Sequence, residues 1–340
     1  PGAVAGLLVL LYFYWKYRAD FQQKMDNQPA MIQESGASII TRMVRLALPV
    51  SLANIMLPVV SNIDLLIVPP RLEVAGYTVE QATELFGYLT GMAVPLVNMA
   101  TILTASLAAS LVPSISEANT LGDRAAIFDR TATAIRIANL ITIPAFVGMW
   151  LLATPISQML YATPNAGTSI AISAIGIFLL GIHQVTTGVL QGLGRTAIPV
   201  VNMVISAGVK VVLSWTLTAV PEWGIKGAAW ASNADFGVAA LLNMFFVYRY
   251  IGFAMDMRDT LKTALAAAVM GLVALGSYEL LFAKGFGNTL STLTAVVVGG
   301  GVYAVVLLLV GSIGERELLK LPVIGQPVAA ALKKIHLLRR

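Results

Sequence analysis

Charged side chains inside apolar segments are the residues of this sequence that could do chemistry. Asp64, Lys210 and Asp235 each lie within a long apolar segment. A charged group in the hydrocarbon core of a membrane is costly unless it is paired or faces water, so such residues mark ion pairs, ion pathways or transport cavities. We therefore treat these three residues as candidates for a central cavity or a coupling site.

Lys210 and Asp235 lie on consecutive predicted helices that are joined by a turn at residues 221–224. Each is about 12 residues, or about 19 Å along a helix, from the middle of this turn, so both lie near the membrane midplane. Opposite charges at one depth indicate an ion pair or two walls of one water-filled cavity, and the alternative is a static salt bridge. Asp64 lies about five residues from the end of its segment by the same measure. It is open to three interpretations: a cation ligand, a partner of Lys210 or an interfacial carboxylate.

Amide side chains lie in the same apolar segments. Three of them are further candidates for the cavity: Asn54, Asn202 and Asn233. Asn202 is two helical turns from Lys210, and Asn233 lies close to Asp235. The alternative for each amide is that it holds neighbouring helices together by hydrogen bonds.

Catalytic and metal-binding motifs are absent from the sequence. It contains two histidines and no cysteine, which excludes disulfides, zinc–thiolate sites and Cys nucleophiles. It contains no HExxH, GxSxG or P-loop pattern. His183, next to Gln184, is expected to form a satisfied buried polar pair, because no second ligand has the right spacing for a metal. The sequence thus predicts a protein that is not an enzyme and needs no cofactor.

Composition indicates which kind of element holds the charged residues. Hydrophobic residues make up 57% of the 340 residues, charged residues 11%, and the mean hydropathy is +0.80. Soluble domains contain about 25% charged residues. The composition therefore excludes a soluble enzyme, a disordered protein and a nucleic-acid-binding domain, and it predicts an all-α polytopic membrane protein.

Nine transmembrane helices are predicted from the apolar segments. They are Ala3–Tyr17, Ile39–Val68, Leu85–Val112, Ile135–Tyr161, Ile170–Gln191, Ile198–Val220, Ile225–Tyr250, Leu261–Phe282 and Leu293–Ile313. The first segment is shorter than the roughly 20 residues that cross a membrane, and it lacks the basic start of a signal peptide. Because the chain also begins without Met, we expect a truncated helix and a C-terminal fragment. Prolines within the segments, such as Pro95 and Pro144, predict kinks.

The basic residues predict the orientation of the chain. Of the 22 Lys and Arg, 18 lie in alternate connections and in the C-terminal residues. By the positive-inside rule this side is cytoplasmic, which places the C-terminus inside and the N-terminus outside. Apolar residues recur at helical spacing within residues 315–340 and are flanked by basic ones, which predicts an amphipathic helix on the inner leaflet or, alternatively, a frayed basic tail.

Four motifs, in order, resemble those of a known family. They are Asp64-Leu-Leu-Ile-Val-Pro69 followed by Arg71-Leu72, Ser110-Leu-Val-Pro-Ser-Ile-Ser-Glu-Ala118, Leu190-Gln-Gly-Leu-Gly-Arg-Thr196 and Gly224-Ile-Lys-Gly-Ala-Ala229. The chain resembles the stage V sporulation protein B family of polysaccharide exporters, within the multidrug/oligosaccharidyl-lipid/polysaccharide superfamily. Lipid II flippases belong to the same superfamily. The resemblance covers roughly residues 1–320.

The resemblance implies a fold of fourteen helices, in which two six-helix lobes face each other and two extra helices follow. On this chain, residues 1–17 resemble the last helix of the first lobe, and residues 18–38 a cytoplasmic linker between the lobes. Residues 39–252 resemble the whole second lobe, residues 253–314 the two extra helices, and residues 315–340 the basic tail.

The resemblance also implies a coupling site. Some members of the superfamily bind a coupling cation in the second lobe, through carboxylates and amides, and Asp64, Asn202 and Asp235 are the nearest counterparts. Lys210 departs from such a site because its ammonium repels sodium. Coupling to a proton, to sodium or to the membrane potential is therefore left open.

The function implied is that of a flippase in the bacterial cytoplasmic membrane. It would move a lipid-linked oligosaccharide or peptidoglycan precursor, of the undecaprenyl pyrophosphate type, by alternating access, with membrane lipids and no nucleic acid as further partners. Arg42, Arg45 and Arg136 are expected headgroup contacts; the alternative is that they are ordinary positive-inside anchors. A multidrug/cation antiporter of the same superfamily is the alternative function. A membrane glycosyltransferase or polymerase is remote, because the longest predicted outer connection, residues 69–84, is too short for a catalytic domain.

Overall fold

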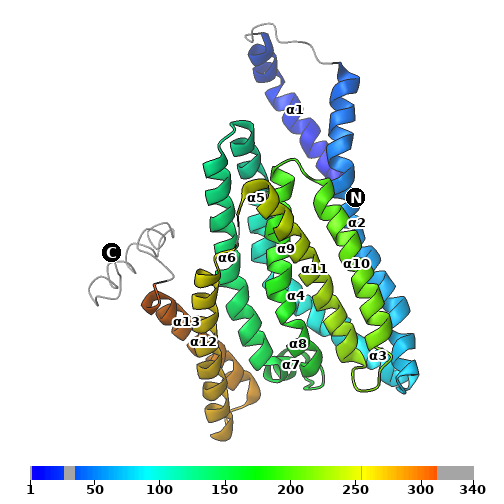
Figure 1. The fold of residues 1–340 in the computed structure, drawn as a ribbon, viewed down its shortest axis with the longest axis vertical. Coiled ribbons are helices and arrows are strands. Elements are labelled where there is room, and N and C mark those ends of the chain that lie inside the picture. Colours follow the sequence, from blue (N-terminus) through cyan, green and yellow to red (C-terminus); the bar gives the residue numbers. More distant parts are fainter. Residues whose placement is uncertain (1, 27–34, 254, 312–340) are drawn as a thin grey trace. The chain divides into compact units, whose positions relative to one another are not determined.

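The computed structural model describes residues 2–26, 35–253 and 255–311. The predicted tail at residues 315–340 and part of the predicted linker lie outside these residues. The chain divides into two compact units, Pro1–Ala47 and Leu48–Arg340, and each is described by itself. Within the described ranges the regular elements are helices (Figure 1), as the composition predicted.

The first unit consists of α1 (Gly2–Asp26) and the beginning of α2 (Gly36–Val74). Helix α1 covers the first predicted apolar segment and continues for nine residues beyond Tyr17, into the stretch expected to be a linker. Arg42 and Arg45 lie on the part of α2 that belongs to this unit, and both are exposed.

The second unit holds the remainder of α2 and all later helices. Their bounds are α3 (Val79–Gly87), the π-helix η1 (Tyr88–Ala93), α4 (Val94–Ala100), α5 (Ile102–Thr120), α6 (Arg124–Leu151), α7 (Ala153–Tyr161), α8 (Gly167–Ser173), α9 (Ile175–Gly192), α10 (Ala197–Leu217), α11 (Ile225–Ile251), α12 (Met257–Ala283) and α13 (Asn288–Leu309). Figure 1 shows that α9, α10 and α11 run side by side with short connections between them.

Six helices of the described chain are long and apolar enough to cross a membrane. They are α6, α8 with α9, and α10 to α13, and a seventh span results if the bent run Val79–Thr120 is counted as one. Helices form over the first two predicted segments, as α1 and α2, but they are not among these six or seven. The prediction of nine transmembrane helices is therefore not confirmed.

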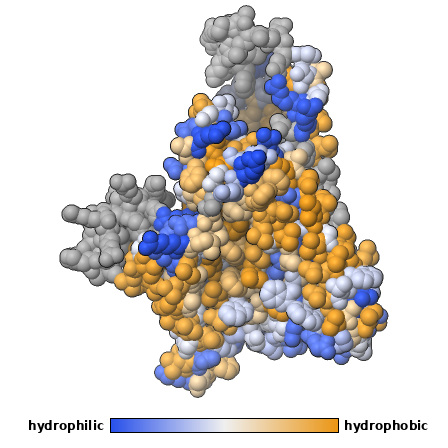
Figure 2. Space-filling view, in the orientation of Figure 1, coloured by the Kyte–Doolittle hydropathy of each residue, from blue (hydrophilic) through white to orange (hydrophobic). Residues whose placement is uncertain are grey.

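The outward-facing side chains of these helices are apolar, as contact with lipid requires. Val212, Leu241, Leu272 and Val297 are examples of large exposed hydrophobic residues on α10 to α13. Figure 2 shows apolar residues over much of the visible sides of the helices, with polar residues toward their ends. A soluble protein rarely exposes so continuous an apolar surface.

Helix α9 is the centre of the second unit, where it packs against α5, α6 and α11. Glycine allows neighbouring helices of this unit to pack closely. A Cβ atom on Gly188 of α9 would lie 2.7 Å from the carbonyl oxygen of Ala108 on α5, and one on Gly227 of α11 would lie 2.7 Å from the backbone of Leu217 on α10. Small residues at such positions let membrane helices approach and gain packing energy.

A bend interrupts the helix predicted at Leu85–Val112. Pro95 has no N–H group and its ring crowds the carbonyl four residues earlier, so a regular α-helix cannot pass through this position. The turn before it is a π-helix, in which the N–H of Val94 donates to the carbonyl of Leu89, and the chain then bends by 47° at Thr101. Single π-helical turns are frequent at functional sites.

The last two described helices are fastened to the rest of the second unit at both ends. Near one end, the Asn139 side chain on α6 donates to Thr260 Oγ1 on α12 at 3.1 Å. Leu140, the next residue of α6, accepts a hydrogen bond from the Tyr303 hydroxyl of α13 at 2.8 Å. At the other end, the Asn288 side chain donates to the carbonyl of Pro155 at 3.0 Å. These bonds join α12 and α13 to α6 and α7.

Candidate functional site

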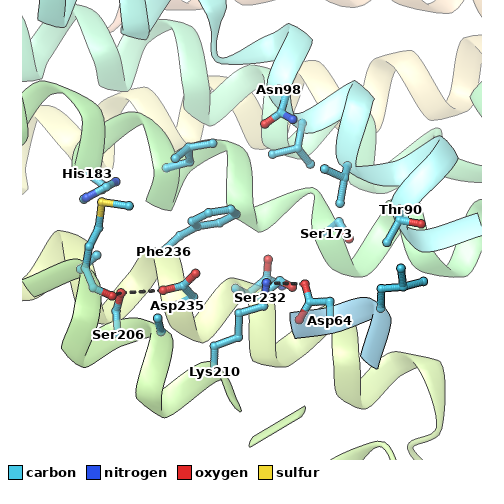
Figure 3. A pocket seen from close by; sticks show the side chains of 18 of the residues that line it. Asp64, Thr90, Asn98, Ser173, His183, Ser206, Lys210, Ser232, Asp235 and Phe236 are labelled. Carbon is cyan, nitrogen blue, oxygen red and sulfur yellow. Dashed lines mark hydrogen bonds and ion pairs between the residues drawn. The ribbon is translucent and has the colours of Figure 1, made fainter. Parts of the chain in front are cut away.

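A cavity of about 370 Å³ lies among α2, η1, α4 and α8 to α11 (Figure 3). Its polar lining comes from seven different elements: Asp64 of α2, Thr90 of η1, Asn98 of α4, Ser173 of α8, His183 of α9, Ser206 and Lys210 of α10, and Ser232, Asn233 and Asp235 of α11. Apolar side chains, such as Phe236, complete the wall. All three charged residues singled out from the sequence thus line one cavity.

Lys210 forms an ion pair with Asp64. The Nζ atom lies 2.6 Å from Asp64 Oδ2, and only 9% of the Lys210 side chain and 17% of the Asp64 side chain are exposed. The N–O distance is that of a short charge-assisted hydrogen bond. Because both groups are largely withdrawn from water, each depends on the other for its charge to be tolerated.

Asp235 has a different partner in the same cavity. Its Oδ1 atom accepts a hydrogen bond from the Ser206 hydroxyl at 2.5 Å. Ser206 and Lys210 are four residues apart and so lie on one face of α10 (Figure 3). Among the described residues, the salt bridge of Lys210 is made with Asp64. The first alternative from the sequence, a direct ion pair between Lys210 and Asp235, was therefore wrong. The second alternative, two walls of one cavity, describes their positions.

Asp64 lies deeper in its helix than its apolar segment indicated. The predicted segment ended at Val68, but α2 continues through Pro69 and Pro70 to Val74. Asp64 is therefore ten residues, or about 15 Å, from the end of the helix. The far end of α2 is anchored where Arg71 Nε donates to the carbonyl of Trp215 at 2.9 Å. Of the three interpretations of Asp64, partner of Lys210 is the one that the geometry supports.

His183 lines the cavity although it was not among the cavity candidates from the sequence. It was expected to form a satisfied polar pair with Gln184, but Gln184 instead accepts a hydrogen bond from Thr104 at 2.6 Å. The His183 side chain is buried, and neither ring nitrogen has a hydrogen-bond partner within the described part of the chain. A buried polar group without a partner is costly, so His183 is an unusual residue to find in the wall of the cavity.

The three amide candidates have different positions. Asn233 lines the cavity while its Nδ2 donates to the carbonyl of Ile172 at 2.7 Å. Asn202 lies outside the lining and donates to Asn243 Oδ1 at 2.8 Å, while Asn243 donates to Thr187 at 2.9 Å. This chain ties α10, α11 and α9 together, as in the alternative interpretation. Asn54 belongs to α2, and its side chain lies outside the described part of the structure.

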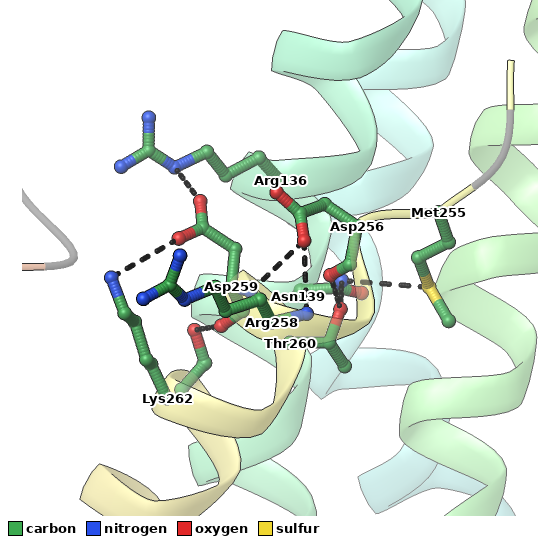
Figure 4. A network of polar contacts seen from close by, with 9 residues as sticks. Arg136, Asn139, Met255, Asp256, Arg258, Asp259, Thr260 and Lys262 are labelled. Carbon is green, nitrogen blue, oxygen red and sulfur yellow. Dashed lines mark hydrogen bonds and ion pairs between the residues drawn. The ribbon is translucent and has the colours of Figure 1, made fainter.

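Arg136 lies at a separate polar cluster, between α6 and the start of α12 (Figure 4). Its Nε atom is 3.1 Å from Asp259 Oδ2, and Lys262 lies 3.9 Å from the other oxygen of the same carboxylate. The cluster borders a second cavity of about 190 Å³. Asp256 begins α12 by accepting the N–H groups of Arg258 and Asp259, an N-cap that fixes where these charges lie.

A free coupling cation does not fit the charged cavity. The oxygen of Asp64 that would bind it is in contact with the Lys210 ammonium, which carries the same charge as the cation. Within the described ranges, no three His, Cys, Asp or Glu side chains come together as metal ligands. The cation site that the family resemblance implied therefore disagrees with the residues present.

Comparison with known families identifies the family of the chain. A family model described as lipid II flippase MurJ matches residues 91–299, which is more than half of the chain. The chain belongs to the MurJ family. It is thus a multi-pass membrane protein of a family of flippases rather than of enzymes, and the resemblance drawn from its motifs is confirmed.

Relatives from Bacillus subtilis (strain 168) match nearly the whole chain. The uncharacterized membrane protein YabM is 24% identical over 94% of the chain and 60% of its own length. Stage V sporulation protein B is 23% identical over 95% of the chain and 62% of its own length. The chain therefore spans about three fifths of the length of these relatives.

A solved structure shares the fold. The structure titled "Lipid II flippase MurJ, inward closed conformation" superposes with a TM-score of 0.59 and 16% identity, over 82% of this chain and 56% of that one. At this identity the likeness establishes the fold alone. The fourteen-helix plan implied for the complete protein extends beyond what this match covers.

Proposed function

We propose that the full-length protein moves a lipid-linked oligosaccharide or peptidoglycan precursor, of the undecaprenyl pyrophosphate type, across the bacterial cytoplasmic membrane. The observation that carries the proposal is the charged cavity inside a bundle of membrane-spanning length. Buried Lys210, Asp64 and Asp235 are expensive to keep in such a bundle. Membership in the MurJ family supports transport as the reason for keeping them.

The charged cavity is too small to enclose such a substrate. A volume of about 370 Å³ is at the lower end of pockets that hold drug-sized molecules, and a lipid-linked oligosaccharide is much larger. We therefore assign the cavity to the conformational cycle, in which its ion pair and hydrogen bonds differ in strength between the inward- and outward-open states. Alternating access requires only such a difference between two states.

Helices α5, α6 and α9 to α11 move as one body in this proposal, and α2, which carries Asp64, changes its position relative to α10. The close contacts of Gly188 with Ala108 and of Gly227 with Leu217 leave no room for sliding between α5 and α9 or between α10 and α11. The bonds of Asn139 and Asn288 couple α12 and α13 to the same body.

Residues 39–252 are proposed as the second lobe and 253–314 as the extra helices, with the C-terminus in the cytoplasm.

Basic side chains at the proposed cytoplasmic side attract the headgroup. Arg42, Arg45 and Arg136 are the proposed contacts, because guanidinium groups bind phosphate oxygens in a bidentate manner. Arg136 contacts Asp259, so a diphosphate would have to replace this carboxylate during binding. The bond is half-exposed, at 34% and 31% of the two side chains, and such pairs are weak enough to exchange.

The proposal is tested with the purified full-length protein in liposomes that carry a labelled lipid-linked precursor on one leaflet. Protein-dependent appearance of intact precursor on the other leaflet supports the flippase. Elongated or cleaved lipid would identify a glycosyltransferase or polymerase. Movement of small cationic dyes without movement of the precursor would identify a multidrug/cation antiporter, and either result would overturn the proposal.

A further inference from the structure

The Lys210 ammonium has the position that a small cation would take beside Asp64. Its Nζ atom is in direct contact with Oδ2 of the carboxylate. Other oxygen atoms border the same space, among them the Ser232 hydroxyl, which lies beside the pair (Figure 3), and the Asp235 carboxylate. Carboxylate and hydroxyl oxygens are the ligands that hard cations prefer. The oxygens of a cation site are thus present, together with a positive charge fixed to the chain.

We infer that Lys210 is a built-in cation, which takes the place of a free alkali cation at Asp64. As the chain stands, the cavity binds no such cation, and shortening Lys210 turns it into a binding site for one. The inference deepens the proposed function, because a cation attached to the protein cannot cross the membrane and so cannot draw energy from a sodium gradient.

Charge and space both support the inference. A second positive charge within about 4 Å of an ammonium is strongly repelled inside a protein, so sodium and Lys210 exclude each other at Asp64. Truncation of Lys210 to Ala removes four side-chain atoms and the charge, which leaves Asp64 without a partner next to a polar cavity. An unpaired buried carboxylate is neutralised by a counter-ion or by a proton, and sodium is small enough to enter the vacated space.

The test measures the melting temperature of the purified full-length protein, not transport, so that its failure is distinct from failure of the proposed function. Tryptophan fluorescence reports unfolding while NaCl replaces choline chloride at constant ionic strength. We expect the melting temperature of the wild type to change by less than about 1 °C. The melting temperature of Lys210→Ala should rise by at least about 5 °C at saturating sodium, since a ligand that binds only the folded state stabilises it.

Three further variants separate a site from a general salt effect. Lys210→Arg keeps the charge and should behave as wild type. Lys210→Ala combined with Asp64→Asn lacks the carboxylate and should lose the sodium response. Lys226→Ala removes an exposed lysine at the start of α11 and should show no response.

Two results would overturn the inference. One is a saturable sodium-specific stabilisation of wild type, and the other is a Lys210→Ala protein that melts at the same temperature in both salts. To guard against loss of folding, Lys210→Ala is extracted and purified in NaCl and then exchanged into choline chloride, with Lys210→Gln as a second variant. Binding of radioactive sodium to wild type gives an independent measurement, and stoichiometric binding would contradict a built-in cation.

Discussion

The Nζ atom of Lys210 lies 2.6 Å from Oδ2 of Asp64, and this contact joins α10 to α2 although the residues are 146 positions apart. It is an ion pair within a helical bundle, not on its surface. Such a pair gives little net stability compared with apolar residues of the same size, but losing one partner leaves an uncompensated charge. The pair therefore makes the relative position of two helices depend on electrostatics, as a conformational cycle needs.

Replacing Lys210 with Met should destabilise the protein by about 3–5 kcal/mol, because Asp64 is left buried without its counter-charge. Adding Asp64→Asn should recover part of this loss, since the unpaired charge is then removed as well. The measurement is a double-mutant cycle on thermal or denaturant unfolding in a sodium-free buffer, with exposed Lys226→Met as the matched control. Strictly additive effects of the two replacements would show that the residues are not coupled.

Replacing His183 with Leu should slow transport without lowering stability. The two ring nitrogens have no partner in the described part of the chain, so folding loses no hydrogen bond when they are removed, and stability should stay the same or rise. The wall of the cavity that we assign to the conformational cycle, however, becomes more apolar next to its charged residues. Melting temperature and transport rate are measured on the same preparation; a large loss of stability with normal transport would make His183 a packing residue instead.

Replacing Arg136 and replacing Asp259 should change the transport rate in opposite directions if Arg136 contacts the headgroup. Asp259→Asn removes the carboxylate charge that competes with a diphosphate for Arg136 and should preserve or increase transport, whereas Arg136→Gln should reduce it. The pair itself should contribute at most about 1 kcal/mol, because both side chains are half-exposed. The initial transport rate in liposomes distinguishes the two roles. Equal losses from both replacements would indicate that the pair only fastens α12 to α6.

The proposed orientation places the connection after α2 and the connection after α12 outside the cell. Cysteine introduced into this cysteine-free chain at Thr78 or Lys284, both exposed, should react with a membrane-impermeant thiol reagent added to intact cells. Cysteine at Asn119, which is exposed in the last turn of α5, should react only after the cells are opened. The reverse pattern would contradict the orientation and the side assigned to Arg136.

The spacing of Lys210 and Asp235 from one turn predicted that the two residues lie at the same depth. In the structure both line the same cavity. The choice of partner was not accessible in this way. It depends on α2 lying beside α10, a contact between segments far apart in the chain. It also depends on α2 continuing past Pro69 and Pro70, whereas a proline pair usually ends a helix.

Hydrogen bonding was harder to anticipate than position. Asn202 is close to Lys210 along the helix, but its amide donates to Asn243 and does not line the cavity. His183 and Gln184 are neighbours in sequence, yet successive residues of a helix face different directions, and Gln184 bonds Thr104 while His183 faces the cavity. The π-helix before Pro95 is a further case, because a proline predicts a kink but not its form.

The most direct test of the account is the rate at which intact lipid-linked precursor crosses the membrane of liposomes that contain wild type or Lys210→Met. Both proteins are first shown to be folded by their melting transitions. The account predicts protein-dependent transfer of unaltered precursor by wild type, and a rate close to that of empty liposomes for the variant. Absence of transfer by folded wild type, or equal rates for the two proteins, would contradict it.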